Sequence, residues 1–167
     1  MTWYRKDVEE LPAEVCWDLL GAAGIGRLAV VVDDQPEIFP VNYAVDHETV
    51  VFRSGEGTKT AAAAEQAPVA LEVDGYDDAT SRAWSVVVKG RAQPVLRGHE
   101  LMNVLELPLF PWQEGLKDKF VRIVPAAVTG RRFSVADPEV WNSSVAGGRR
   151  TPSGSAAWAE AGDPDLP

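Results

Sequence analysis

Residues 27–45 read RLAVVVDDQPEIFPVNYAV, in which a polar turn separates two apolar runs. The first run is rich in β-branched residues, and the turn Asp33-Asp34-Gln35-Pro36 contains residues that favour chain reversal. In the second run, apolar side chains recur at every other position and share one face: Phe39, Val41, Tyr43 and Val45. The stretch therefore predicts two paired strands, of which the second spans 37–45.

The same period of two recurs along the chain on either side of this hairpin. Further strands are expected at 49–54, 69–73, 84–91 and 120–124, and 127–133 continues the last of these. Helices are expected at 11–23, 57–66 and 97–106, and a polar, mobile link at 74–81. Most links are too short for parallel crossovers, so we expect a mainly β (α+β) fold, a small antiparallel barrel with short peripheral helices.

The amino-acid composition argues against several classes of function. The 167 residues contain 16 Lys plus Arg against 25 Asp plus Glu, a net charge of −9, which disfavours nucleic acid and anionic membranes as partners. No apolar run approaches the roughly 20 residues that span a bilayer. The single Cys16 and the absence of a signal-like start predict a cytoplasmic protein, with Cys16 as a core residue. Residues 138–167 are rich in Gly, Ser, Ala and Pro and predict a flexible tail after a domain at 1–137.

The segment VVFRSGEGTK, residues 50–59, carries candidate binding residues. Arg53 and Ser54 end a predicted strand, and Thr58 and Lys59 begin a predicted helix. Glycines between them permit close approach, and a helix start offers N–H groups to an anion. The segment is consistent with a phosphate site. The alternative is that Thr58 only caps the helix and that the two cations are solvated.

Two neighbouring strands could supply the rest of a site. Pro40 cannot donate to a β-ladder and marks an edge or bulge where backbone groups and Asn42 could meet a flat heterocycle. In 84–92, Trp84 alternates with Ser85, although this segment is equally consistent with a core strand that has a Trp at its rim. His47 and His99 lie in polar surroundings and predict surface residues, and no metal-ligand spacing is present.

Four segments in this order resemble the pyridoxamine 5′-phosphate oxidase-like proteins of the flavin-binding split-barrel superfamily. They are GRLAVVVDDQPEIFPVNYAV, VVFRSGEGTK, WSVVVKGRA and LPLFPWQEGLKDKFVRIVPAAVTGRRF, and the resemblance covers about Val8 to Phe133. It implies a homodimer of split antiparallel barrels, with flavin mononucleotide (FMN) bound at the subunit interface by the domain at 1–137.

The resemblance also implies roles for individual residues. The phosphate would be held by Arg53, Ser54, Thr58 and Lys59. The ring would lie along Pro40, Val41 and Asn42, with Phe39 and Phe52 nearby. The ring and ribityl chain would be reached by Trp84, Ser85 and Val86, and Trp112 would close the pocket.

The chain departs from true pyridoxamine 5′-phosphate oxidases, because it lacks their closing Arg-Leu-x-Pro signature; Arg131 and Arg132 face either a substrate or solvent. The leading hypothesis is an FMN-dependent oxidoreductase acting on an unidentified small molecule. One alternative is a reductase using the deazaflavin F420, whose acidic tail the charge of −9 disfavours. Another is a flavin- or haem-binding protein without catalysis.

Overall fold

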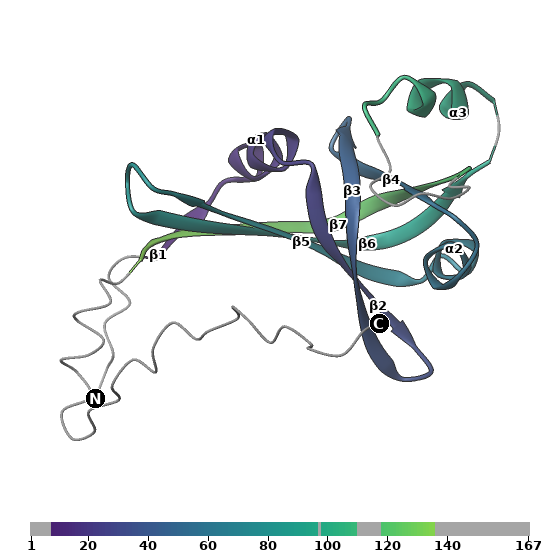
Figure 1. Cartoon of the computed structure of the whole chain (residues 1–167), viewed down its shortest axis with the longest axis horizontal. Coiled ribbons are helices and arrows are strands. Elements are labelled where there is room, and N and C mark those ends of the chain that lie inside the picture. Colours follow the sequence, from purple (N-terminus) through teal and green to yellow (C-terminus); the bar gives the residue numbers. More distant parts are fainter. Residues whose placement is uncertain (1–7, 97, 110–117, 136–167) are drawn as a thin grey trace, which may run out of the picture. The chain divides into compact units, whose positions relative to one another are not determined.

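The computed structural model describes residues 8–96, 98–109 and 118–135. Their elements, in chain order, are β1 (Val8–Leu11), α1 (Ala13–Ala22), β2 (Ile25–Val32), β3 (Gln35–Asp46), β4 (Thr49–Ser54), α2 (Thr58–Ala64), β5 (Pro68–Asp77), β6 (Arg82–Val95), α3 (Gly98–Leu105) and β7 (Lys119–Ser134). Strands dominate, so the predicted mainly β class is confirmed (Figure 1). Within the described part of the chain, no helix is long and apolar enough to span a membrane.

Six strands close on themselves. The antiparallel pairings run β2–β3, β3–β4, β4–β7, β7–β6, β6–β5 and β5–β2, which returns to the starting strand. Strand β7 pairs with β6 along its whole length, whereas its other edge pairs first with β4 and later with β1. The predicted split antiparallel barrel is therefore confirmed. A barrel of this kind leaves few strand edges exposed to solvent.

Two tight turns connect β2 to β3 and β3 to β4. Both central residues of each turn have positive φ: Asp33 (48°), Asp34 (59°), His47 (47°) and Glu48 (57°). These are the dihedrals of two-residue hairpin turns whose twist matches that of the flanking strands. The predicted four-residue turn at 33–36 is therefore wrong, because strand pairing already begins at Gln35.

The first half of the link predicted as mobile at 74–81 is strand, which is a second correction. Strand β5 continues to Asp77, and its last residues pair with the start of β6. This end of the hairpin is polar, and Gly75 leaves room for the indole of Trp84, since a Cβ at Gly75 would lie 2.6 Å from the ring. The carboxylate of Asp77 then fixes the turn by accepting hydrogen bonds from the amide of Ala79 (2.9 Å) and the hydroxyl of Thr80 (2.7 Å).

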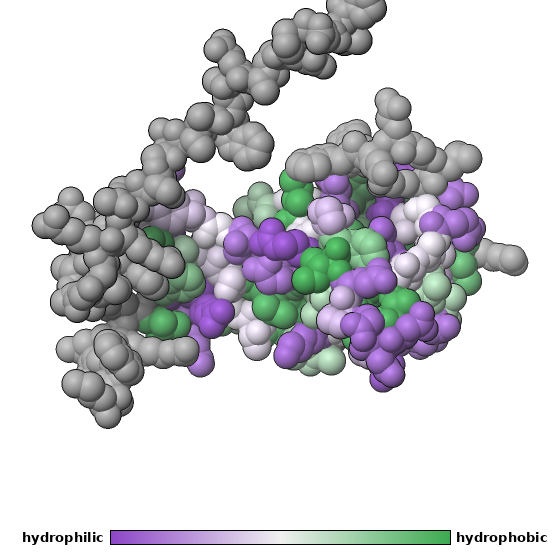
Figure 2. Space-filling model, turned by 60° about the horizontal axis from the view of Figure 1, so that its bottom comes forward, coloured by the Kyte–Doolittle hydropathy of each residue, from purple (hydrophilic) through white to green (hydrophobic). Residues whose placement is uncertain are grey.

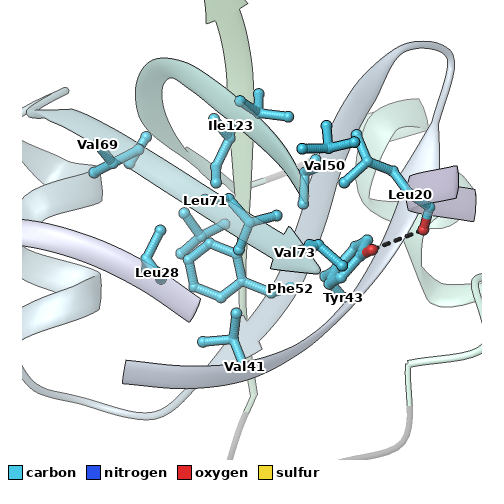
Figure 3. Packing of buried hydrophobic residues seen from close by; sticks show 14 of the residues in the cluster. Leu20, Leu28, Val41, Tyr43, Val50, Phe52, Val69, Leu71, Val73 and Ile123 are labelled. Carbon is cyan, nitrogen blue, oxygen red and sulfur yellow. Dashed lines mark hydrogen bonds between the residues drawn. The ribbon is translucent and has the colours of Figure 1, made fainter. Parts of the chain in front are cut away.

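The main core fills the barrel. Phe52, Leu28, Leu71 and Ile123 are fully or almost fully buried there (Figure 3). Cys16 lies in the same core, with burial raising the pKa of its thiol, so its predicted structural role is confirmed. A second, smaller cluster lies under α3 and consists of Val51, Val95, Val104, Leu109 and Phe120.

Candidate functional site

The loop after β4 is held in place by two hydroxyl groups. Ser54 is only 2% exposed, and its hydroxyl donates a hydrogen bond to the carbonyl oxygen of Gly55 (3.0 Å). Thr60, which the sequence did not single out, donates a second hydrogen bond to the same oxygen (2.6 Å). Ser54 thus shapes the loop from inside.

Three cations surround this loop. The guanidinium of Arg53 lies over the ring of Phe120, 5.2 Å from its centroid, and the ammonium of Lys59 lies over the ring of Phe39, 4.4 Å from its centroid. Both rings position the charges by cation–π contact. Lys119, a residue absent from the sequence-based prediction, forms an ion pair with Glu56 in the loop. A hydrogen bond to Glu56 is the main reason that the pKa of Lys119 is raised, so the ammonium stays charged.

Helix α2 begins directly after this loop. Gly57 occupies the cap position at φ 135°, and its carbonyl accepts hydrogen bonds from the amides of Thr60 (3.1 Å) and Ala61 (3.0 Å). The amides of Thr58 and Lys59 lie at the start of the helix, ahead of its first hydrogen bonds. Three cations, one carboxylate and these two amides give the loop a net positive character, which suits a phosphate.

Strand β3 has an open edge beside this loop. In the part of the chain that the structure describes, β3 pairs with β4 only over Tyr43–Asp46, whereas β2 covers the other edge from Gln35 onward. The amide of Tyr43 donates to Gly24 on the β2 side (3.1 Å). Because backbone groups alternate in direction along a strand, those of Pro40 and Asn42 point to the open edge. The edge position predicted for Pro40 is confirmed.

The predicted residues of β3 and β6 divide between two faces of the sheet. Cross-strand neighbours place Pro40 in one row with Arg27, Glu72, Val87 and Thr129 on the outer face. By alternation, Asn42 and Ser85 share that outer face. The opposite face belongs to the core, where three predicted side chains are buried: Val41 (6% exposed), Phe52 (0%) and Val86 (0%). A ligand outside the barrel could meet these three only through their main-chain atoms.

Ser85 lines a cavity of about 530 Å³ on the outer face, together with Val87 of β6, Thr129 and Arg131 of β7, and residues of β1. The guanidinium of Arg131 donates to the hydroxyl of Ser85 (3.4 Å). From the sequence, Arg131 and Arg132 were predicted to face the same surroundings, either a substrate or solvent. In a strand, however, the side chains of successive residues point to opposite faces of the sheet. Arg132 and Trp84 accordingly line a different cavity, described below.

The loop cations and the Ser85 cavity lie at opposite ends of the barrel. Arg53 pairs with Phe120, which pairs with Val95 at the far end of β6 from Ser85. Ser85 and Val95 are ten positions apart on β6, which corresponds to roughly 33 Å along the strand at about 3.3 Å per residue. One mononucleotide cannot reach both groups within one protomer. Trp112, which was predicted to close the pocket, lies outside the described residues.

Comparison with known proteins supplies the family. The family model described as pyridoxamine 5′-phosphate oxidase matches residues 12–132. The chain belongs to the pyridoxamine 5′-phosphate oxidase-like family. The resemblance deduced from the four sequence segments is therefore confirmed.

Two solved structures, both described as FAD-binding proteins, are similar to this chain in sequence and fold. The structure from Mycobacterium smegmatis is 38% identical, covers 75% of this chain and 98% of its own, and superposes with a TM-score of 0.66. The structure from Mesorhizobium loti is 31% identical, covers 76% and 99% respectively, and gives a TM-score of 0.65. An uncharacterised protein of Mycobacterium tuberculosis is 38% identical over 89 residues, which cover 53% of this chain and 79% of that protein.

Proposed function

We propose that this protein binds a flavin, FMN, through the loop between β4 and α2. The observation that carries the proposal is the gathering of Arg53, Lys59 and Lys119 around a glycine loop beside the open edge of β3. Arg53 and Lys59 would bind the phosphate, with the first amides of α2 and Thr58 as further donors. Ser54 would maintain the shape of the loop from inside.

The ring of the flavin would lie along the open edge of β3. Flavin rings have a polar rim of carbonyl and N–H groups. The main-chain groups of Pro40 and Asn42, together with the Asn42 side chain, can exchange hydrogen bonds with such a rim. Phe39 would contribute by holding the ammonium of Lys59 over its ring.

The site would be completed by a second copy of the chain. Ser85 and Arg131 are too far along β6 and β7 to join the loop of their own protomer, but they could approach the β3 edge of a partner. The outer face carries the ion pairs of Arg27 with Glu72 and Asp74, but it also exposes the apolar side chains of Val31 (64% exposed) and Ile38 (66% exposed). A groove of about 490 Å³ is lined by Val31 and Pro36. Figure 2 shows hydrophobic residues reaching the surface among hydrophilic ones. Burying such a face would stabilise a homodimer.

The proposed activity is oxidoreduction of a small molecule. A bound flavin supplies hydride or electron transfer, and the protein residues named above would bind and orient it. The chain needs no acid–base pair of its own for this chemistry. Because two relatives above 30% identity are described as FAD-binding proteins, FAD is the second candidate, with its pyrophosphate at the same loop.

The identity of the cofactor can be read from the purified protein. Oxidised-flavin absorption bands, followed by chromatography of the released cofactor against FMN and FAD standards, would support the proposal and decide between them. A single deazaflavin band, a haem Soret band, or a colourless protein that takes up no added flavin would contradict it. Anaerobic reduction with NADH or NADPH and reoxidation by quinones or nitroaromatics would then test turnover; none across a broad panel would indicate a binding protein.

The phosphate role has its own test. The double variant Arg53→Gln, Lys59→Gln should bind FMN at least tenfold more weakly, because each charge-assisted contact contributes about 1.5 to 3 kcal/mol. Its affinity for riboflavin, which has no phosphate, should stay unchanged. Arg132→Gln removes a cation from another cavity and serves as the control. An equal loss of FMN and riboflavin affinity would argue against a phosphate site at this loop.

A further inference from the structure

A second cavity lies on the other side of the sheet from Ser85, between α1 and the β5–β6 hairpin. Its volume is about 290 Å³, and its lining consists of Leu19, Asp77, Thr80, Arg82, Trp84 and Arg132. Ligand pockets begin at roughly 300 Å³, so this cavity suits a ligand with a single ring. The proposed flavin site uses none of these side chains.

Trp84 forms a fixed aromatic wall of this cavity. Its indole lies directly against Gly75 on the neighbouring strand, where any side chain would clash with the ring. Leu19 of α1 contributes an apolar surface to the same cavity. A planar ring bound in this cavity could therefore contact both an indole and an aliphatic side chain.

Two guanidinium groups stand beside that wall. Arg132 is the cross-strand neighbour of Trp84, and Arg82 lies two residues before it on β6. Among the described residues, Arg82 donates to the carboxylate of Glu9 at 3.1 Å, whereas Arg132 lies 4.0 Å from the same oxygen, beyond hydrogen-bond distance. Arg132 thus keeps most of its five donors for another acceptor.

The remaining charge in the cavity is Asp77. Both of its oxygens accept hydrogen bonds from the hairpin turn, one from the amide of Ala79 and one from the hydroxyl of Thr80. The bond from Thr80 is the main reason that the pKa of Asp77 is lowered. Asp77 therefore stays ionised, and its charge also interacts with that of Arg132. The cavity lining still carries a net positive charge, because it holds the two guanidinium groups of Arg82 and Arg132 against this one carboxylate.

We propose that this cavity is a binding site for a small aromatic carboxylate. The ring packs between Trp84 and Leu19, and the carboxylate pairs with the guanidinium of Arg132, whose planar fork matches two carboxylate oxygens. Arg131, the next residue toward the N-terminus, points to the opposite face and takes no part. The site is independent of the flavin site, so either proposal can fail without the other.

Benzoate is the probe for this site. In the ¹⁵N-labelled full-length protein as purified, the indole N–H signal of Trp84, assigned by its loss in Trp84→Phe, should shift and saturate as benzoate is added. Arg132→Gln should weaken this binding at least tenfold, and Arg131→Gln, which removes the neighbouring cation on the opposite face, should leave it within twofold of the wild type. Benzamide, which has a similar shape but no charge, should bind at least tenfold more weakly than benzoate.

A further variant tests the aromatic wall without changing any charge. Gly75→Ala should displace the indole and weaken benzoate binding, while thermal melting shows that the protein remains folded. The proposal would be overturned by a Trp84 signal that does not respond to benzoate, by equal affinity in Arg132→Gln, or by benzamide binding as tightly as benzoate.

Discussion

The hydroxyl of Tyr43 donates a 2.7 Å hydrogen bond to the main-chain carbonyl of Leu20 and so joins strand β3 to the last turns of α1 (Figure 3). Tyr43 is only 4% exposed, and burial raises its pKa to about 12. Removing the hydroxyl in Tyr43→Phe should lower the free energy of unfolding by about 1 kcal/mol, measured by urea denaturation at pH 7.

The same residue predicts an alkaline limit of stability. Since the native pKa lies above the ordinary tyrosine value of 10.0, the contribution is complete below pH 10 and is lost as the pH rises through about 12. The total loss is about 2 to 3 kcal/mol. Urea titrations between pH 9 and 11.5 should show this slope in the wild type and a smaller slope in Tyr43→Phe. Identical slopes would mean that another group titrates.

An ion-pair cluster around Arg122 predicts that the protein loses stability at acid pH. Arg122 of β7 binds Asp46 (2.8 Å) and Glu100 of α3 (2.9 Å), and its side chain is 13% exposed. Burial acts to raise the pKa of Asp46, but hydrogen bonds from Arg122 and His47 outweigh this effect and the pKa is lowered. The stabilisation is therefore present above about pH 4 and lost as the pH falls through the native pKa.

The corresponding variant is Asp46→Asn. It should be destabilised by about 1 to 3 kcal/mol at pH 7, because Arg122 loses a charged partner, and its stability should change less than that of the wild type below pH 4. Glu48→Gln, in the exposed turn nearby, should behave as the wild type. Equal acid sensitivity of Asp46→Asn and the wild type would show that the cluster does not set the acid limit.

Any side chain at Gly90 is expected to destabilise the protein by steric clash. The register shifts by one residue between β6 and β7 at this point, and a Cβ at Gly90 would lie 2.1 Å from the carbonyl oxygen of Val124. Gly90→Ala should therefore cost at least about 2 kcal/mol. Gly21→Ala is the matched control, since nothing lies within 4 Å of its Cβ, and in a helix this change should stabilise by about 0.5 to 1 kcal/mol. Thermal or urea unfolding of both variants checks the contrast.

The proposed homodimer can be tested at an exposed apolar residue of its outer face. Ile38→Glu places a charge on that face and should shift the protein from dimer to monomer in light scattering, with a parallel loss of flavin. Met102→Glu, an equally exposed apolar position on α3, should change neither. A monomeric Ile38→Glu variant that still retains flavin at wild-type affinity would argue against a site shared between subunits.

Subunit mixing gives a sharper test of the shared site. A protomer with Arg53→Gln and Lys59→Gln lacks the phosphate half, and a protomer with Arg131→Gln lacks part of the other half. Each homodimer should bind FMN weakly. In the mixed dimer, however, one of the two sites combines two intact halves, so about half of the wild-type binding capacity should return, measured by flavin fluorescence titration. No recovery on mixing would place both halves in one protomer.

The alternation of apolar and polar residues predicted most of the strands, because in these strands every other side chain faces the core. The alternation in 37–45 holds in the structure, where Val41 and Tyr43 are buried and Pro40 is exposed. The polar end of the β5–β6 hairpin escaped prediction because Asp74 and Asp77 extend past the core, where strand pairing rather than burial holds the chain extended. The strand propensity of single residues does not predict such pairing between strands.

Only part of the candidate site could be predicted from the sequence. Arg53 and Lys59 are near neighbours in the chain, so their grouping was visible. Lys119 joins them only because β7 pairs with β4, a contact between residues far apart in sequence. The alternation of Trp84 with Ser85 was visible in the sequence, and it sends their side chains to opposite faces of β6, although the resemblance implies that both reach the flavin.

Strand β7 has a consequence for how the protein is made. Because β4, β6 and β1 all pair with it, none of these edges is covered until Ser134 has left the ribosome. The nascent chain must carry open strand edges for almost the whole length of the domain, and late, long-range pairing of this kind slows folding and exposes the chain to aggregation. Truncations within β7 should therefore accumulate as insoluble protein rather than as a smaller soluble domain.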